Sequence, residues 1–194
     1  MAIEETRRKI LSVANKLFSQ FGFHKTSMDE IAKIARKAKG SLYYHFASKE
    51  ELFTAVVATE INNLKAQLSL VVSDNTLPAD KKIKEYLIKR MEVLYTSANY
   101  HETLKADFFE HFDFIDNLRK ELDLWEKQQI QSIIYQGVDE NIFENQNGNI
   151  DVLLDVFIMV LKGLEIPFFL QNKYENLRPH FDDLLRILIK GLGK

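Results

Sequence analysis

Apolar residues recur at helical spacing along almost the whole chain of 194 residues. In the first stretch, Ile10, Leu17 and Phe21 fall on one face of a helix that starts at about Glu4. Gly22 follows directly, and glycine readily takes the left-handed conformation that ends a helix. The pattern therefore predicts an amphipathic first helix that stops at this glycine.

Two capping boxes mark further helix starts. Residues 27–30 (SMDE) and 48–51 (SKEE) each place a serine three positions before a glutamate, so the hydroxyl can accept the glutamate amide. A short helix is expected between them, at about residues 39–44, after a break at residues 36–38. This arrangement predicts a helix-turn-helix at residues 27–46, whose last helix can enter a DNA major groove.

The rest of the chain is helical in pattern as well. The whole chain has only 7 glycines and 3 prolines, which provide too few turns for a β fold of many strands. We therefore predict an all-α fold of about nine helices. The later helices are expected at about residues 49–72, 79–97, 102–114, 117–143, 150–170 with a bend at Pro167, and 179–192.

Charge is distributed unevenly, although the formal net charge is only −2. Residues 1–50 carry 10 lysines and arginines against 5 acids, and the remaining residues carry 16 against 23. A basic end on an acidic body is typical of a protein that binds a polyanion through one end, or it arises by chance. Cysteine is absent, which excludes disulfides and cysteine-based zinc sites. No stretch is typical of a signal peptide or a membrane span, so we expect a cytoplasmic protein.

The short helix after the break concentrates groups that contact nucleic acid. Three lysines and two tyrosines crowd into residues 37–49 together with Ser41 and His45. Leu42 and Phe46, four positions apart, are expected to anchor this helix in the core. Gly40 has no side chain, so DNA can approach the backbone there. The alternative is an ordinary solvated helix, which two tyrosines among lysines argue against.

Several of these segments resemble the tetracycline-repressor (TetR) family. The segments are residues 17–23 (LFSQFGF), 26–32 (TSMDEIA), 39–46 (KGSLYYHF) and 48–52 (SKEEL). As a spaced set they are far more specific than a single short motif. The resemblance implies an N-terminal helix-turn-helix DNA-binding domain at residues 1–48. It implies an effector-binding and dimerisation domain at residues 49–194.

The resemblance also implies roles for individual residues. Thr26 and Lys49 would contact phosphates at the two edges of the footprint. Tyr43 and Tyr44 would contact the DNA backbone or base edges, and the start of the same helix would read bases. The candidate DNA-binding residues are Thr26, Ser27, Lys37, Lys39, Gly40, Ser41, Tyr43, Tyr44, His45 and Lys49.

Three adjacent residues depart from the family pattern. Arg36 stands where the family usually has a turn glycine, and Lys37 where a small apolar residue is common. Ala38 stands where a serine or threonine usually caps the recognition helix, and a missing cap costs about 1 kcal/mol. These changes affect the geometry of the turn and the base preference.

The stretch from residue 150 to residue 170 is apolar around nearly its whole circumference, and the last helix adds a second apolar stripe. Two such helices meeting their symmetry mates would form a four-helix interface, whereas the alternative is a deep core within one chain. Two-fold reading of DNA favours the homodimer, and the resemblance implies the same helices. The candidate dimer-interface residues are Leu153, Phe157, Val160, Leu164, Phe181, Leu184 and Leu188.

Aromatic and acidic residues are concentrated in the middle of the chain. In the TetR family the middle helices enclose an effector pocket, and an aromatic cavity suits an apolar, aromatic or cationic molecule. The alternative is an ordinary aromatic core, which is the more frequent case. Asp107 and His111 would share a helix face, but two ligands do not make a metal site. The candidate effector-binding residues are Tyr95, Phe108, Phe109, Phe112, Trp125 and Phe157.

Together these patterns predict a homodimeric transcriptional repressor that binds a palindromic double-stranded operator and is released by a small-molecule effector. No cofactor, metal or membrane partner is expected. An enzyme is not expected either, because the chain has no glycine-rich phosphate loop, no GxSxG motif and no cysteine. The alternatives are a helical protein-interaction module without a DNA role and a metal-dependent hydrolase.

Overall fold

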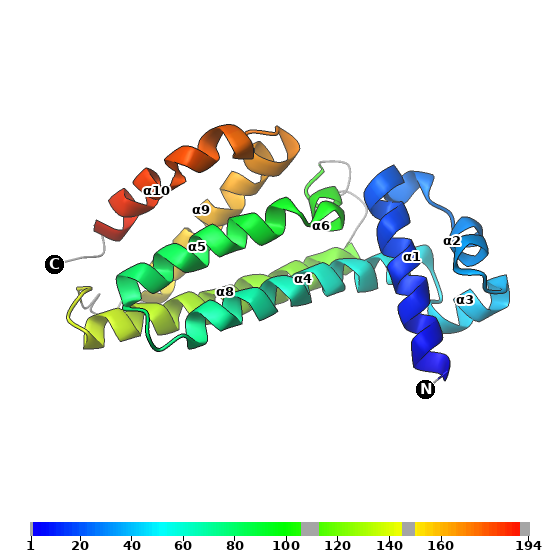
Figure 1. Cartoon of the computed structure of the whole chain (residues 1–194), viewed down its shortest axis with the longest axis horizontal. Coiled ribbons are helices and arrows are strands. Elements are labelled where there is room, and N and C mark those ends of the chain that lie inside the picture. Colours follow the sequence, from blue (N-terminus) through cyan, green and yellow to red (C-terminus); the bar gives the residue numbers. More distant parts are fainter. Residues whose placement is uncertain (1, 106–112, 145–149, 191–194) are drawn as a thin grey trace. The chain divides into compact units, whose positions relative to one another are not determined.

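The structure is built from helices, as the sequence predicts. The computed structural model describes residues 2–105, 113–144 and 150–190 (Figure 1). Within these ranges there are nine α-helices, one π-helix and no β-strand, and no helix is long and apolar enough to cross a membrane. The elements are α1 (Ala2–Lys25), α2 (Met28–Ala35), α3 (Lys39–His45), α4 (Lys49–Ser73), α5 (Ala79–Tyr95), α6 (Ala98–Glu102), α8 (Asp113–Asp139), α9 (Ile150–Glu165), the π-helix η1 (Ile166–Leu170) and α10 (Tyr174–Lys190).

Local signals set the helix boundaries near the N-terminus. Gly22 has φ 80° and ψ 167°, so it breaks α1 at the predicted position, although helical turns follow it. Ser27 caps α2 by accepting the amide of Glu30 at 3.2 Å. Ser48 accepts the amide of Glu51 at 3.1 Å at the start of α4. Both predicted capping boxes are therefore confirmed as helix starts.

The α6 helix forms where the sequence predicts no helix. The prediction at residues 102–114 is wrong about the start, because α6 ends where that range begins. The N-terminus of α6 is capped from a distant helix: the Glu60 carboxylate accepts the amides of Asn99 at 3.3 Å and Tyr100 at 2.7 Å. A cap supplied from another helix leaves no signal in the local sequence.

Two prolines near the C-terminus behave differently from the prediction. Pro167 lies in η1, which continues α9 directly, so the predicted bend is a change of helix type. The α10 helix begins at Tyr174 rather than at Pro179, which lies inside it. Tyr174 is buried against the rings of Phe168 and Phe169, with centroids 5.9 and 6.2 Å away. This packing extends the helix beyond the start that proline alone favours.

The chain divides into two compact units. The first comprises residues 1–62 and 97–118, and the second comprises residues 63–96 and 119–194. The core of the first unit contains the ring pair of Phe18 and Phe53, which meet edge to face at 5.1 Å. In the second unit α10 packs against α5 (Figure 1). The predicted division by function at residue 48 stays a prediction.

The α9 helix leaves one apolar face uncovered. The sequence predicts burial on several sides, and Leu154 and Leu161 are indeed buried. Val152, Val156 and Met159, however, are more than half exposed in the single chain. The apolar circumference of α9 therefore exceeds what its own chain covers.

Candidate nucleic-acid interface and core cavity

Two buried side chains hold the short helix α3 in place. Leu42 and Phe46 are buried, as their spacing predicts. The guanidinium of Arg7, from α1, lies over the Phe46 ring at 4.9 Å from its centre. Burial of these two anchors determines which face of α3 points outward.

The outward face of α3 presents phenol, amine and backbone groups. Tyr44 is 73% exposed and Tyr43 is 42% exposed, and Lys39 is exposed as well. His45 is half-buried, and its ring meets Tyr44 edge-on at 5.3 Å. A β carbon added to Gly40 would meet no atom within 4 Å, so a partner can approach the backbone. Such groups bind phosphate oxygens and base edges.

Lys39 has a partner on the neighbouring helix. Its Nζ lies 2.7 Å from Asp29 Oδ1. The hydrogen bond and the charge of Asp29 raise the pKa of Lys39, which keeps the amine charged. Both side chains are mainly exposed, and exposed ion pairs are weak. A phosphate can therefore replace Asp29. The exposed Ser27 caps the N-terminus of α2, and the half-buried Ser41 lies on α3.

The three residues that depart from the family pattern form the turn before α3. Arg36 has φ 55° and ψ 45°, the left-handed conformation that favours glycine. Its amide still closes α2 by donating to the carbonyls of Ala32 and Lys33. Ala38 has the extended conformation of an N-cap but makes no side-chain cap, which confirms the prediction of a missing cap. The turn thus forms with a non-glycine residue in the left-handed conformation and without a side-chain cap on α3.

Three predicted contact residues make hydrogen bonds within the first unit. Thr26 is buried and donates its hydroxyl to a carbonyl near the end of α1 at 2.9 Å. Lys49 donates Nζ to the carbonyls of Phe23 and Thr26 at 3.1 and 3.2 Å. Lys37 donates to the hydroxyl of Thr6 at 3.0 Å. These groups link α1 to the helices after it, and their contacts with phosphate stay predictions.

The half-buried carboxylate of Glu60 joins α4, α6 and α1. Besides the α6 amides, Glu60 accepts the side-chain amide of Asn99 at 2.7 Å, and Asn99 also donates to Asn15 at 2.6 Å. Burial raises the pKa of Glu60, while the hydrogen bonds from Asn99 and Tyr100 oppose the shift. No local sequence pattern predicts this cluster, because Glu60 and Asn15 lie 39 and 84 positions from Asn99.

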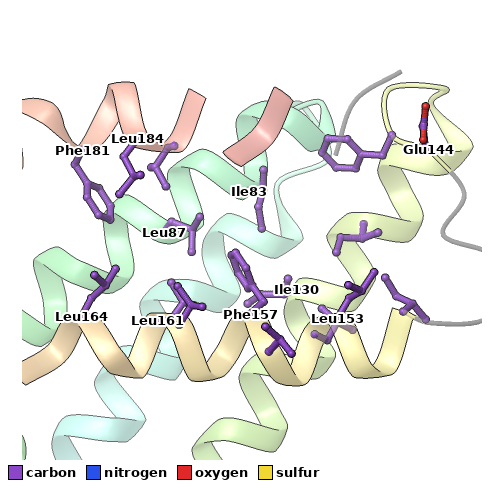
Figure 2. A pocket seen from close by; sticks show the side chains of 17 residues that line it. Ile83, Leu87, Ile130, Glu144, Leu153, Phe157, Leu161, Leu164, Phe181 and Leu184 are labelled. Carbon is purple, nitrogen blue, oxygen red and sulfur yellow. The ribbon is translucent and has the colours of Figure 1, made fainter. Parts of the chain in front are cut away.

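The second unit contains a cavity of about 570 Å³, bounded by α5, α8, α9 and α10 (Figure 2). Leu161 and Leu164 of α9 face Phe181 and Leu184 of α10 across it. Among the described residues that line it, all side chains are apolar except Glu144, which stands apart from the other labelled side chains in Figure 2. The volume suits a small molecule, since ligand pockets measure roughly 300–1,000 Å³.

The predicted effector residues do not converge on this cavity. Phe157 lines it, but the ring of Tyr95 instead packs at a tilt against Tyr174, with centroids 4.7 Å apart. The amine of Lys65 lies over the Trp125 ring, 5.7 Å from its centre. The remaining candidates lie outside the described residues: Phe108, Phe109 and Phe112, together with Asp107 and His111. Their part in effector binding stays a prediction.

The predicted dimer residues, in contrast, gather around the cavity. The side chain of Leu188 is not among those described, but the other six all line it. They are Leu153, Phe157, Val160, Leu164, Phe181 and Leu184. The side chains predicted to form the dimer interface are thus the same side chains that form part of the cavity wall.

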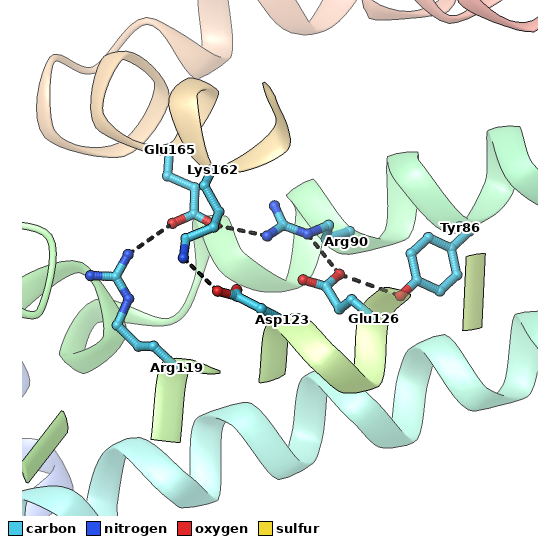
Figure 3. A network of polar contacts seen from close by, with 7 residues as sticks. All are labelled: Tyr86, Arg90, Arg119, Asp123, Glu126, Lys162 and Glu165. Carbon is cyan, nitrogen blue, oxygen red and sulfur yellow. Dashed lines mark hydrogen bonds and ion pairs between the residues drawn. The ribbon is translucent and has the colours of Figure 1, made fainter. Parts of the chain in front are cut away.

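A network of buried charges crosses the same unit (Figure 3). Arg90 of α5 donates to Glu126 of α8 at 2.8 Å and to Glu165 of α9 at 2.7 Å, and all three side chains are buried. Arg119 lies 3.8 Å from Glu165. The hydroxyl of Tyr86 donates to Glu126 at 3.3 Å, and burial, followed by the charge of Glu126, raises the pKa of this phenol. The network joins three helices at the residue where α9 passes into η1.

This network was not predicted from the sequence, although the sequence contains a signal for it. Glu126 comes four positions after Leu122 and four before Ile130, so a carboxylate occupies a buried helical stripe. Glu165 likewise follows buried Leu161 by four positions. A charge on a core stripe requires an ionic partner, but the pattern does not identify that partner.

The N-terminal part of the sequence matches a known family. Residues 10–56 match the model for bacterial regulatory proteins, tetR family. The uncharacterized HTH-type transcriptional regulator YhgD of Bacillus subtilis (strain 168) is 26% identical over 191 residues, which cover 97% of each chain. The HTH-type transcriptional regulator RutR of Escherichia coli (strain K12) is 39% identical over 92 residues, which cover 47% of this chain and 42% of RutR.

Two solved structures share the fold over nearly the whole chain. A transcriptional regulator from Cytophaga hutchinsonii aligns with a TM-score of 0.74 at 22% identity, covering 95% of this chain and 97% of that one. SmeT in complex with triclosan aligns with a TM-score of 0.77 at 15% identity, covering 98% of this chain and 92% of SmeT. At these identities the likeness concerns the fold.

Proposed function

The chain belongs to the tetR family of bacterial regulatory proteins, and we propose that it is a repressor that binds a palindromic operator as a homodimer and is released by a small molecule. The observation that carries the proposal is the outward face of α3. There two tyrosines, a lysine and an open glycine backbone project from a helix anchored by Leu42 and Phe46. Such a helix enters the major groove as the second helix of a helix-turn-helix.

The contacts with DNA are of two kinds. Lys39 and Ser41 read base edges at the start of α3, where Gly40 lets the backbone come close. The hydroxyl of Tyr44 and the cations around the turn bind phosphates, which fix the register without specifying sequence. Two copies present their α3 helices to half-sites about 34–36 Å apart, so the operator is a palindrome.

The second unit supplies dimerisation and effector binding. The second copy packs against the exposed apolar face of α9 and α10. The effector occupies the cavity, whose walls suit an apolar molecule. SmeT, which shares the fold, forms a complex with triclosan, and an effector of low polarity fits the lining here. Effector and operator then weaken each other's binding reciprocally.

The test is selection of binding sequences from a random duplex library, followed by affinity measurements against salt. We expect a palindrome bound with a Kd of about 10⁻⁸–10⁻¹¹ M and a steep loss of affinity with salt. Tyr44→Ala removes a phosphate contact and should lower the affinity for that palindrome. Tyr135→Ala, which removes an exposed tyrosine of α8, is the matched control and should leave that affinity unchanged. If no sequence is enriched by the wild type, the proposal is wrong.

A further inference from the structure

The cavity of the second unit opens on the face that α9 and α10 leave exposed. Leu153, Val156 and Val160 of α9 line the cavity, as does Leu184 of α10. Yet these residues are 47, 52, 51 and 41% exposed, respectively. A side chain that lines a cavity and also reaches solvent lies at its opening. In a single chain, a bound apolar molecule would therefore keep part of its surface in water.

This opening lies within a larger apolar surface on the same two helices. The surface continues through exposed residues that lie outside the cavity lining, namely Val152, Met159, Leu177 and Ile187. Contiguous exposed apolar patches mark protein interfaces. A dimer built on α9 and α10 places a second copy over the opening, because the opening and the patch share both helices.

We therefore propose that a second copy of the chain closes the cavity, so that the site for a neutral apolar ligand is complete only in the dimer. The inference rests on the proposed function, because it takes the α9–α10 dimer from there. It adds that the ligand site and the dimer interface are one continuous structure.

The walls define the class of ligand. Phe143, Phe157 and Phe181 contribute rings, and the other wall residues contribute hydrocarbon apart from Glu144. Within the described lining there is no lysine, arginine or histidine. A carboxylate or phosphate would lose its hydration without gaining a cation, and Glu144 would repel it. A neutral hydrocarbon chain or ring system loses nothing of this kind and gains by burial.

Closure by the second copy links ligand binding to dimerisation. A ligand that binds the dimer and not the single chain must shift the equilibrium toward the dimer. The experiment follows the sedimentation of the full chain over a dilution series, with and without the neutral fluorescent probe N-phenyl-1-naphthylamine. Saturating probe should lower the dimer dissociation constant by about tenfold or more. At equal chain length, 1-decanol should displace the probe about tenfold more effectively than decanoate.

Two variants separate the cavity from the interface. Leu87→Phe fills the back wall on α5, where Leu87 is buried, and should abolish probe binding while the dimer persists. Met159→Lys alters only the exposed face and should weaken the dimer, with probe binding recovered at high protein concentration. Helix content and the unfolding midpoint establish that each variant folds, and Ile130→Phe replaces Leu87→Phe if that variant does not.

Three outcomes would overturn the inference. A monomeric Met159→Lys that binds the probe as tightly as the wild type would show that one chain completes the site. A wild-type dimer that binds no probe at any concentration would show that side chains of the second copy fill the cavity. Displacement by decanoate as effective as by 1-decanol would exclude the ligand class. None of these measurements involves DNA, so their failure is distinct from a failure to bind an operator.

Discussion

The turn before α3 and the ionic network of the second unit use charge in opposite ways. Around the turn the cations are mainly exposed, and Lys39 pairs with Asp29, only ten positions away. In the network, Arg90 is buried with Glu126 and Glu165, which lie 36 and 75 positions from it. An exposed cation can exchange its partner for a phosphate at little cost, whereas a buried one must keep its partner. The difference separates charges that can serve a binding partner from charges that hold helices together.

The largest expected effect comes from breaking the buried network. Arg90→Met leaves two buried carboxylates without their shared cation and should lower the free energy of unfolding by about 3–5 kcal/mol. Chemical denaturation at a fixed protein concentration measures this loss. The matched control is Arg186→Met, whose pair with Asp183 is exposed and whose loss should cost less than about 1 kcal/mol. If both variants lose the same free energy of unfolding, the claim that buried and exposed ion pairs differ in this protein is wrong.

Restoring the missing cap should have a smaller effect of opposite sign. Ala38→Ser places a hydroxyl at an N-cap that already has the extended conformation, and should stabilise the protein by about 1 kcal/mol. Ser48→Ala removes the existing cap of α4 and should destabilise by a similar amount. Thermal or chemical unfolding of both variants measures the pair. If Ala38→Ser does not raise the free energy of unfolding, the first backbone amides of α3 already have hydrogen-bond partners, such as water, in the wild type.

Relieving the left-handed residue should change stability and binding in opposite directions. Arg36→Gly removes a backbone cost of about 1–2 kcal/mol, partly offset by the entropy of glycine, for a net gain of about 0.5–1 kcal/mol. It also removes a cation beside α3, so the slope of log affinity against log salt should fall by up to about one. Arg36→Lys keeps both the conformation and the charge and should change neither quantity. A stabilised variant with an unchanged salt slope would place Arg36 outside the DNA contact.

The smallest expected effect is a pH dependence within the first unit. The pKa of Glu60 is raised in the folded protein, so the folded state binds more protons than the unfolded state at pH values above the ordinary value of 4.5. Stability should therefore fall as the pH rises through this window. Glu60→Gln should flatten that part of the profile, whereas Glu50→Gln, at an exposed position of α4, should leave it unchanged. A wild-type profile that rises over the same window would contradict the burial argument.

The sequence predicted what local chemistry determines. The capping serines, the break at Gly22 and the two anchors of α3 are all confirmed, because each depends on residues within a few positions. The start of α6 depends on Glu60, which lies 39 positions before Asn99, and no local pattern contains that information. The buried partners of Arg90 could not be predicted for the same reason, since pairing across helices depends on tertiary packing.

The candidate sites follow the same rule. The outward side chains of α3 follow from helical periodicity, so Tyr43 and Tyr44 are exposed as expected. The internal hydrogen bonds of Thr26 and Lys49 depend on how α1 ends against its neighbours, which periodicity does not describe. The cavity likewise depends on four helices meeting, so composition alone could not show which aromatic residues would line it.

The turn before α3 has a consequence for how variants of this protein would spread. Arg36 and Ala38 are both residues that stability alone would replace, with glycine and serine respectively. A population selected only for heat resistance should therefore acquire these two changes early. A population that must also retain its operator should keep the arginine and accept only the serine, because the serine adds a cap without removing a charge. The order in which positions 36 and 38 change would therefore show whether the protein was selected for stability alone or for stability together with operator binding.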